Sequence, residues 1–382
     1  MRKKKLIPVF KKKYKYLFKK MLDKELIRQA FIKMRKGKSK RKKIQIINAN
    51  LDYYIDKMYE SLKNSIPDGD NPELAFIPPI HKPIKIHEHG KDRLIYVPDI
   101  WEQWVHHIIM QVLAPICMKK FHYDSYGSIP NKGLHKGAKQ FVKYKKKYKY
   151  AYKCDIRHFY ANIRKDVLRK QLESFIDDDW FIELIMTCFT HHKKGLPLGF
   201  YLSQWLANVV LNDLDWMIEG SGLDHIRYVD DIVIFSNNKT KLYAVVKEIK
   251  QYLGRELRLS LKDGGKLINL DKEDISFLGF VFRGTTIRLR GKIKRNIIKI
   301  VHRIRKALDN KCPIWIKDAR RILSALGWIE HSNSYAFYSV HIQPFIIVKK
   351  IKDIVSKNDK KERLFNYDSM DLRRIRPSAI AT

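Results

Sequence analysis

The chain has 382 residues, of which 45% are hydrophobic and 12% aromatic. This length and composition predict a large core divided among two or three packed units. Lys and Arg total 78 against 40 acidic residues, a formal net charge of +38, which favours nucleic acid over an anionic membrane as partner. The sequence has no run of 18 apolar residues, no signal-peptide core and no CxxC pair, so we expect no membrane span, zinc site or disulfide framework, and a reducing cytoplasm.

The first 50 residues carry 20 Lys/Arg and two acids. Aromatic and aliphatic residues interrupt this charge, so we expect residues 1–64 to form a basic, mainly helical N-terminal extension. The next stretch, Ser65–Pro83, contains five prolines and is expected to be irregular.

Strands and helices then alternate along the chain. The hydrophobic pattern predicts strands at Lys91–Val97 and Tyr150–Ile156, a strand pair within Ile226–Ser236, and a hairpin of Ile275–Phe282 with Thr286–Arg290. It predicts helices at Trp101–Phe121, Gly133–Tyr144, Arg164–Phe175, Gln204–Ile218 and Thr240–Leu257, and a basic helical region from Lys292 onward. This mixture indicates an α+β fold with a mainly helical C-terminal third.

Three acids stand in apolar strand segments. Asp230 and Asp231 interrupt IRYVDDIVIFS, and Asp155 ends the predicted strand that begins at Tyr150. A buried carboxylate is costly without a partner, whereas divalent cations prefer carboxylate oxygens as ligands. The three acids therefore predict a site for two Mg²⁺ ions, or Mn²⁺ in their place, the usual device for in-line phosphoryl displacement. The alternative for Asp230 and Asp231 is a polar hairpin turn.

The order of motifs over residues 80–345 resembles a reverse transcriptase, and bacterial members in particular. The segments that carry the resemblance are GKDRLIYVP (fingers strand), Phe121–Phe141 (second conserved block), YKCDIRHFYANI (first metal-binding aspartate), Gly195–Asp215 (template and nucleotide positioning), YVDD (palm hairpin), LGF within Phe277–Phe282 (primer grip) and Leu326–Tyr335 (thumb).

The resemblance implies a right-hand polymerase fold. Residues 65–150 would be the fingers, 151–290 a palm whose antiparallel sheet carries YVDD, and 291–382 a helical thumb with a basic tail. Asp155 and Asp230 would be the principal metal ligands, with Asp231 as a weaker third and the backbone carbonyl of Ile156 as a further ligand.

The resemblance also implies nucleotide-binding residues. Arg93, and Lys91 with it, match the basic fingers residues that hold the incoming triphosphate, a task that suits arginine's planar donor fork; the alternative is an exposed basic strand. Tyr160 matches the aromatic residue that blocks a 2′-hydroxyl, which implies deoxynucleotide selection unless it is only a core residue. Lys262 or Lys266 matches the lysine that protonates pyrophosphate, and the spacing leaves both open. The other residues assigned to nucleotide binding are Leu198, Gly199, Ser203 and Gln204.

Two departures from the family pattern are informative. Leu198 precedes Gly199 where many members have Gln, and this resembles the enzymes of diversity-generating retroelements, in which the change accompanies error-prone copying. Leu198 therefore implies relaxed base selection, with simple packing as the alternative. Glu102-Gln103 stands where group II intron relatives usually have Asp-Arg, which argues against that group.

The implied function is that of an RNA-directed DNA polymerase in the bacterial cytoplasm. It would use dNTPs, an RNA template and a DNA primer or product, and would work on a dedicated structured non-coding RNA in phage defence or in a diversity-generating retroelement. An accessory protein or a homo-oligomer stays open. The alternative from another class is a catalytically silent RNA-binding scaffold with a reverse-transcriptase-like palm.

Overall fold

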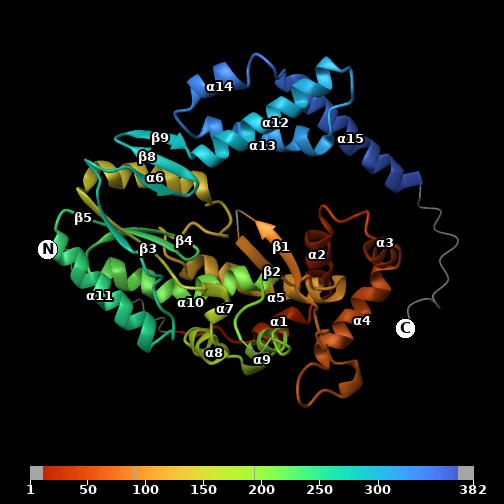
Figure 1. The fold of residues 1–382 in the computed structure, drawn as a ribbon. Helices are drawn as coiled ribbons and strands as arrows, with labels where there is room; N and C mark the ends of the chain where they lie inside the picture. Colours follow the sequence, from red (N-terminus) through yellow and green to blue (C-terminus); the bar gives the residue numbers. More distant parts are fainter. Residues whose placement is uncertain (1–11, 89–90, 193, 369–382) are drawn as a thin grey trace. The chain divides into compact units, whose positions relative to one another are not determined.

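The computed structural model describes residues 12–88, 91–192 and 194–368 (Figure 1). The chain divides into two compact units, Met1–Ile268 and Asn269–Thr382, and the first contains every predicted site residue. The predicted fingers, palm and thumb boundaries stay predictions. Residues 1–11 of the predicted extension and 369–382 of the predicted tail lie outside the described residues. In the part of the chain that the structure covers, no helix has the length and apolar character needed to cross a membrane.

The N-terminal segment is helical, as predicted, and belongs to the core of the first unit. Its helices are α1 (Leu17–Met21), α2 (Lys24–Arg35), α3 (Lys42–Ala49) and α4 (Leu51–Lys63). Ile27 and Phe31 on α2 are fully buried against α5 (Ile100–Lys120). The Trp104 indole on α5 donates to the Ile27 carbonyl at 2.8 Å and its ring lies 4.9 Å from that of Phe31. The apolar residues that interrupt the basic run are thus its packing face.

A four-stranded sheet lies at the centre of the first unit, with strand order β4-β5-β3-β6. The strands are β3 (Tyr150–Asp155), β4 (Asp224–Tyr228), β5 (Asp231–Ser236) and β6 (Lys266–Asn269). β5 pairs antiparallel with both β3 and β4, and the register sets Cys154 opposite Ile232 and Asp155 opposite Asp231. Because side chains alternate across a strand, Cys154 and Ile232 share one face of the sheet while the two acids share the other.

Helices cover the apolar face of this sheet. Ile232, Ile234 and Cys154 join the main core, which also contains the inner faces of α10 (Tyr201–Gly220) and α11 (Lys239–Arg255). On the opposite face α6 (Leu134–Lys147) covers the end of β5 far from the acids, where the rings of Phe141 and Phe235 lie 5.3 Å apart. Figure 1 shows α10 and α11 on one side of the sheet and α6 on the other. Helix α6 does not reach the other end of this face, where Asp155 on β3 and Asp231 on β5 lie.

The remaining elements of the first unit are short. A separate hairpin pairs β1 (Ile84–Glu88) with β2 (Lys91–Ile95), where the strand was predicted. The helices are α7 (Phe159–Asn162), α8 (Lys165–Glu173) and α9 (Asp179–Thr187). The predictions omit α9, which begins where the Asp178 carboxylate accepts from the Phe181 amide at 3.1 Å. One 3₁₀ turn, Pro72–Leu74, interrupts the otherwise irregular proline-rich stretch.

The second unit contains a three-stranded antiparallel sheet of β7 (Ile275–Phe277), β8 (Phe280–Arg283) and β9 (Thr286–Leu289). The single strand predicted over Ile275–Phe282 is wrong, because the chain turns at Leu278 and Gly279, both with positive φ (51° and 80°), and sets Phe277 opposite Phe280. Four helices follow, as predicted for this basic region: α12 (Gly291–Asp309), α13 (Ile316–Glu330), α14 (Tyr335–His341) and α15 (Val348–Asp368).

Candidate active site

The three predicted acids meet at one end of the central sheet. Asp155 closes β3 directly opposite Asp231, the first residue of β5. Asp230 directly precedes Asp231 in the two-residue turn of the β4–β5 hairpin, and its carbonyl oxygen accepts from the Ile156 amide at 3.3 Å. The strand pairing thus brings together all four predicted metal-ligand positions.

The electrostatics of the three acids differ. All three are half-buried. Burial and the Asp155 carboxylate raise the pKa of Asp230 to about 6. The charge of Asp231 is balanced by a cation, because its Oδ2 lies 3.4 Å from Nζ of Lys153. Lys153 was not among the residues predicted from the sequence. Negative charge is therefore concentrated at Asp155 and Asp230, while Asp231 is turned toward a cation.

The donors fit a hard divalent cation. Carboxylate and backbone carbonyl oxygens are the ligands that Mg²⁺ prefers. Among the residues that the structure describes, no three His, Cys, Asp or Glu side chains form a ready metal-ligand group. The fit therefore rests on the close Asp155 and Asp230 carboxylates with the backbone of Ile156 beside them, and Asp231 would join after leaving Lys153.

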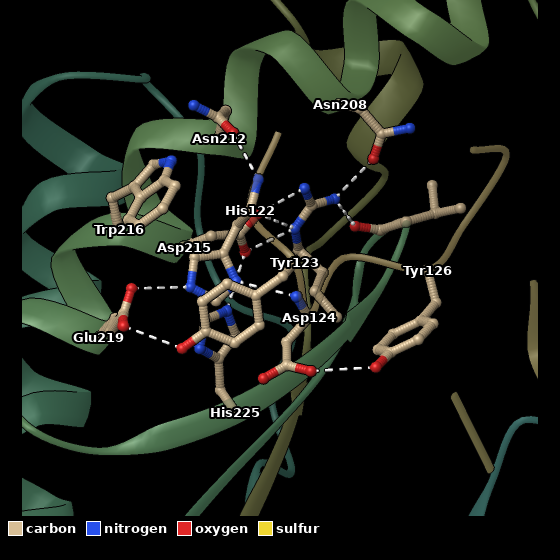
Figure 2. Close-up of polar contacts among 12 residues, drawn as sticks. His122, Tyr123, Asp124, Tyr126, Asn208, Asn212, Asp215, Trp216, Glu219 and His225 are labelled. Carbon is tan, nitrogen blue, oxygen red and sulfur yellow. Dashed lines mark hydrogen bonds and ion pairs between the residues drawn. The ribbon is translucent and has the colours of Figure 1, made fainter. Parts of the chain in front are cut away.

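A buried arginine supports the tip of the hairpin. Arg227 on β4 is fully buried, and its guanidinium donates to both carboxylate oxygens of Asp215 on α10, with Nε–Oδ1 2.8 Å and Nη2–Oδ2 2.7 Å. Its Nη1 donates at 2.9 Å to the Asn208 side chain and at 2.9 Å to the backbone carbonyl of Val229 (Figure 2). Val229 directly precedes Asp230, so α10 is tied to the turn that presents the catalytic candidate.

Sequence reasoning missed Arg227 and Asp215, although a signal was present. Asp215 falls within the predicted long apolar helix Gln204–Ile218, and Arg227 within the predicted strand pair Ile226–Ser236. A buried charge needs a partner of opposite sign. The ion pair between Arg227 and Asp215 could therefore have been predicted from the sequence, whereas the hydrogen bond from Arg227 to the Val229 carbonyl could not.

The second conserved block lies along β4. Arg227 exchanges backbone hydrogen bonds with this block, its amide donating to the Asp124 carbonyl at 3.0 Å and its carbonyl accepting from the Tyr126 amide at 2.9 Å. Gly127 then packs on the turn so closely that a Cβ there would lie 2.6 Å from the Val229 nitrogen. The block thus holds the hairpin from the side opposite β5.

Further polar contacts anchor this block to α10. The His122 ring nitrogen lies 3.1 Å from the Glu219 carboxylate, and the Tyr123 hydroxyl donates to the same carboxylate at 2.8 Å. The Asn212 side chain accepts from the His122 amide at 3.1 Å. Figure 2 shows these contacts on the same helix as Asp215 and Asn208, the two residues whose side chains bind Arg227.

Tyr160 lies near the acids. Burial and the charge of Asp230 raise the pKa of Tyr160 to about 12. Its backbone carbonyl accepts from the Leu196 amide at 2.7 Å, and Gly195 (φ 77°) packs against it so closely that a Cβ would lie 2.6 Å from that oxygen. The loop before α10 is therefore tied to Tyr160.

The same loop is tied to the β1–β2 hairpin. The Tyr96 amide, directly after β2, donates to the Leu198 carbonyl at 2.8 Å. Gly199 has φ 106°, and a Cβ there would overlap the Tyr96 carbonyl oxygen. Arg93 is exposed on β2, while the side chain of Lys91 lies outside the described residues. This contact explains how the predicted fingers strand and the predicted nucleotide-positioning loop are brought together.

The other predicted site residues are placed as follows. Ser203 and Gln204 stand in the first turn of α10, Ser203 buried and Gln204 exposed. Lys262 and Lys266 are both exposed. The Lys262 amide donates to the Asp155 carbonyl at 2.7 Å, whereas Lys266 begins β6 four residues later. The chain therefore holds the backbone of Lys262 beside the acids.

A buried group of aromatic and titratable side chains underlies the loop at Leu198–Phe200. Glu102 on α5 is fully buried, and one of its oxygens lies 2.6 Å from Nε2 of His81. The ring of Phe200 lies 5.2 Å from that of His81 and 5.3 Å from that of His192. Burial raises the pKa of Glu102 to about 8 and lowers the pKa of His81, so the burial of both side chains favours their uncharged forms.

The chain is similar in sequence to known proteins. Residues 80–282, more than half of the chain, match the family described as reverse transcriptase (RNA-dependent DNA polymerase). Protein YkfC of Escherichia coli strain K12 is 23% identical over 247 residues, covering 51% of this chain and 63% of its own. The retron Ec73 reverse transcriptase of Escherichia coli is 23% identical over 192 residues, covering 45% of this chain and 59% of its own. The matches thus span about three fifths of these relatives.

Solved structures of low sequence identity are also similar. Apo telomerase from Candida tropicalis aligns with a TM-score of 0.43 and 14% identity, covering 77% of this chain and 67% of that one. Telomerase from Candida albicans in complex with a fragment of telomeric RNA aligns with a TM-score of 0.44 and 12% identity, covering 73% and 60%.

Proposed function

Because the chain belongs to the reverse transcriptase family, whose domain matches residues 80–282, we propose that it is an RNA-directed DNA polymerase that makes cDNA. The family membership and the mixed helix and antiparallel-sheet architecture identify a right-hand polymerase fold. One observation carries the activity: Asp155, Asp230 and Asp231 converge at the tip of a buried hairpin, supported from behind by a fully buried ion pair.

Asp155 and Asp230, with the carbonyl of Ile156, would hold two Mg²⁺ ions, and Asp231 would contribute less because Lys153 competes for it. Such ions lower the pKa of an attacking 3′-hydroxyl and neutralise a triphosphate. Lys262 would give a proton to the leaving pyrophosphate, and its backbone hydrogen bond to Asp155 favours it over Lys266.

The remaining residues would select and hold the nucleotide. Arg93 and Lys91 would pair with the triphosphate, and Tyr160 would exclude a 2′-hydroxyl from beside Asp230. Gly199 would allow the loop of Leu198 to approach β2, so that the base and the triphosphate are positioned by one connected set of backbone contacts.

The RNA and the biological role are also proposals. The likeness to a retron reverse transcriptase supports a retroelement-type enzyme. We further propose that it works in the bacterial cytoplasm on a dedicated structured RNA. Synthesis of cDNA fits a role in phage defence and equally a role in a diversity-generating retroelement. Sequencing the nucleic acid that copurifies with the protein would distinguish them, because a copied repeat that is rich in substitutions identifies the second.

Primer extension on an RNA template with Mg²⁺ and dNTPs tests the activity. We expect extension by the wild type and a loss of about a thousandfold for Asp230→Asn, since the metal site supplies several kcal/mol of transition-state stabilisation. Asp263→Asn is the matched control, because the Asp263 side chain is 92% exposed in the loop after Lys262. A wild type that binds RNA but does not extend a primer would instead favour the silent scaffold.

A further inference from the structure

The second unit contains a cleft that the polymerase chemistry does not use. Its volume is about 410 Å³, and it lies between the end of α12, the following loop and the start of α13. Asp318 is the one carboxylate among its lining residues, and Arg303 already engages it through hydrogen bonds of 2.8 and 2.7 Å. The other cationic side chains of the lining are Lys306, Lys317 and Arg321, and the Arg321 guanidinium also lies 3.9 Å from the Asp318 carboxylate. The cleft therefore keeps a net positive charge.

An aromatic side chain forms one wall of this cleft. Trp315, directly before α13, is 76% exposed. No other ring stacks on it among the residues that the structure describes. An indole face beside cationic groups is the combination that binds single-stranded nucleic acid, because each base can stack on a flat ring while its phosphate meets a cation.

We propose that this cleft binds single-stranded RNA, with a base stacked on Trp315 and the neighbouring phosphates paired with Lys306, Lys317 and Arg321. Its volume is near the lower end for small-ligand sites, so it admits one or two nucleotides. A duplex is excluded because its bases already stack on one another. The choice of RNA as the strand rests on the proposed function, whereas the cleft itself contains none of the residues proposed for polymerisation.

The charge of the surroundings favours RNA over a protein partner. Helix α12 carries seven Lys/Arg and one acid, and the whole chain has a net charge of +38. The buried centre of a protein–protein interface is depleted of charge, and lysine in particular is rare there. Phosphates, in contrast, gain from each cation and release counterions on binding.

The exposed thiol of Cys312 lines the cleft and provides a direct reporter, since Cys117, Cys154 and Cys188 are buried. The rate of Cys312 alkylation in the full-length protein is measured by peptide mass spectrometry, with and without an RNA of about 12 unpaired uridines. We expect the single strand to slow alkylation at least about fivefold, with protection declining as salt rises. An RNA duplex of equal length should protect much less.

Variants localise the effect. Trp315→Ala should weaken the protecting affinity about tenfold or more, and Trp315→Phe should restore most of it, because stacking on an aromatic face carries much of the binding. Tyr335→Ala is the control, since Tyr335 is 72% exposed in the same unit and does not line the cleft. The Asp230→Asn variant should protect Cys312 as the wild type does, so this test is independent of primer extension.

Three results would overturn the proposal. Binding of the single strand without protection of Cys312 would place the RNA elsewhere. Equal protection by duplex RNA would exclude base stacking, and stronger protection by single-stranded DNA or an acidic peptide would assign the cleft to another partner.

Discussion

The Arg227 guanidinium donates to the backbone carbonyl of Val229 at 2.9 Å, which connects a buried ion pair to the turn that carries Asp230. Val229 has φ 61°, a left-handed conformation that is costly for a β-branched residue. Arg227 is itself held by Asp215, both residues being fully buried. The position of the acidic tip therefore depends on a charge that solvent and substrate do not reach.

Arg227→Lys is expected to loosen this tip. Lysine keeps the charge but lacks the planar fork, so it cannot serve Asp215 and Val229 together. We expect a loss of about 2–4 kcal/mol in unfolding free energy, by comparison with broken buried pairs. We also expect a lower kcat and a higher Mg²⁺ concentration for half-maximal extension, measured by denaturant unfolding and by primer extension.

The control for Arg227→Lys is Arg164→Lys, an exposed arginine that grips Asp166 with two hydrogen bonds of 2.9 Å. It should change stability by less than about 0.5 kcal/mol, since exposed pairs contribute little. A Mg²⁺ requirement and kcat that stay at wild-type values in Arg227→Lys would contradict a positioning role for Arg227.

Gly199→Ala is expected to separate the loop of Leu198 from β2, because the added Cβ overlaps the Tyr96 carbonyl oxygen at a φ of 106°. The KM for dNTPs should rise about tenfold, equivalent to about 1.4 kcal/mol of lost binding, as measured by steady-state extension. Gly133→Ala is the control: its φ is 90° but no atom lies within 4 Å, so it adds backbone strain alone. An equal rise in KM in both variants would refute the importance of the close approach.

Tyr160→Ala should admit ribonucleotides. Removing the ring opens space beside Asp230 where a 2′-hydroxyl would lie, so the ratio of rNTP to dNTP incorporation should increase about tenfold or more. Tyr160→Phe retains the ring and should keep the selectivity of the wild type. Selectivity that survives in Tyr160→Ala would mean that Tyr160 serves only packing.

Leu198→Gln should lower the error rate if an apolar residue at this position relaxes base selection. We expect misincorporation to fall by about tenfold, the range that a single polar contact can provide. Leu198→Met, which preserves volume and polarity, should keep the wild-type error spectrum. Identical spectra for Leu198→Gln and the wild type, measured by sequencing the products, would show that Leu198 merely packs.

Stability should depend on pH through Glu102. Its pKa rises from 4.5 to about 8 on folding, so the folded protein holds a proton that the unfolded chain has released. Stability relative to Glu102→Gln should therefore fall as pH rises from about 5 to 8, by up to about 1.4 kcal/mol per pH unit. The pKa values of His81 and His106 are lowered on folding, so these histidines make the folded protein less stable as pH falls. Both histidines are present in the wild type and in Glu102→Gln, so the comparison of the two proteins isolates Glu102.

Urea unfolding of the wild type and Glu102→Gln at several pH values measures this difference. A difference in unfolding free energy that does not change between pH 5 and 8 would mean that Glu102 is ionised in the folded protein, paired with a protonated His81.

Much of this molecule could be predicted from local patterns. The strands that carry Asp155 and Asp231 are recognisable because β-branched and aromatic residues surround one or two costly acids, and the helix that contains Asp215 is a long periodic apolar run. The requirement of Asp155 and Asp230 for a cation links two segments that lie 75 residues apart in the sequence (230 minus 155). Hydrophobic periodicity predicts which face of a helix or strand is buried, but it does not identify the element that packs against that face.

The partners themselves depend on the folded chain. The register that sets Asp155 opposite Asp231, the packing of Gly127 on Val229 and the approach of Gly199 to Tyr96 each join two segments, and neither segment's own sequence pattern predicts the other as its partner. The turn at Leu278 and Gly279 likewise divides what reads as one strand, because the pairing of Phe277 with Phe280 stabilises a left-handed Leu278. Such contacts are long-range or conformationally strained, so their free energy exists only once the whole unit has packed.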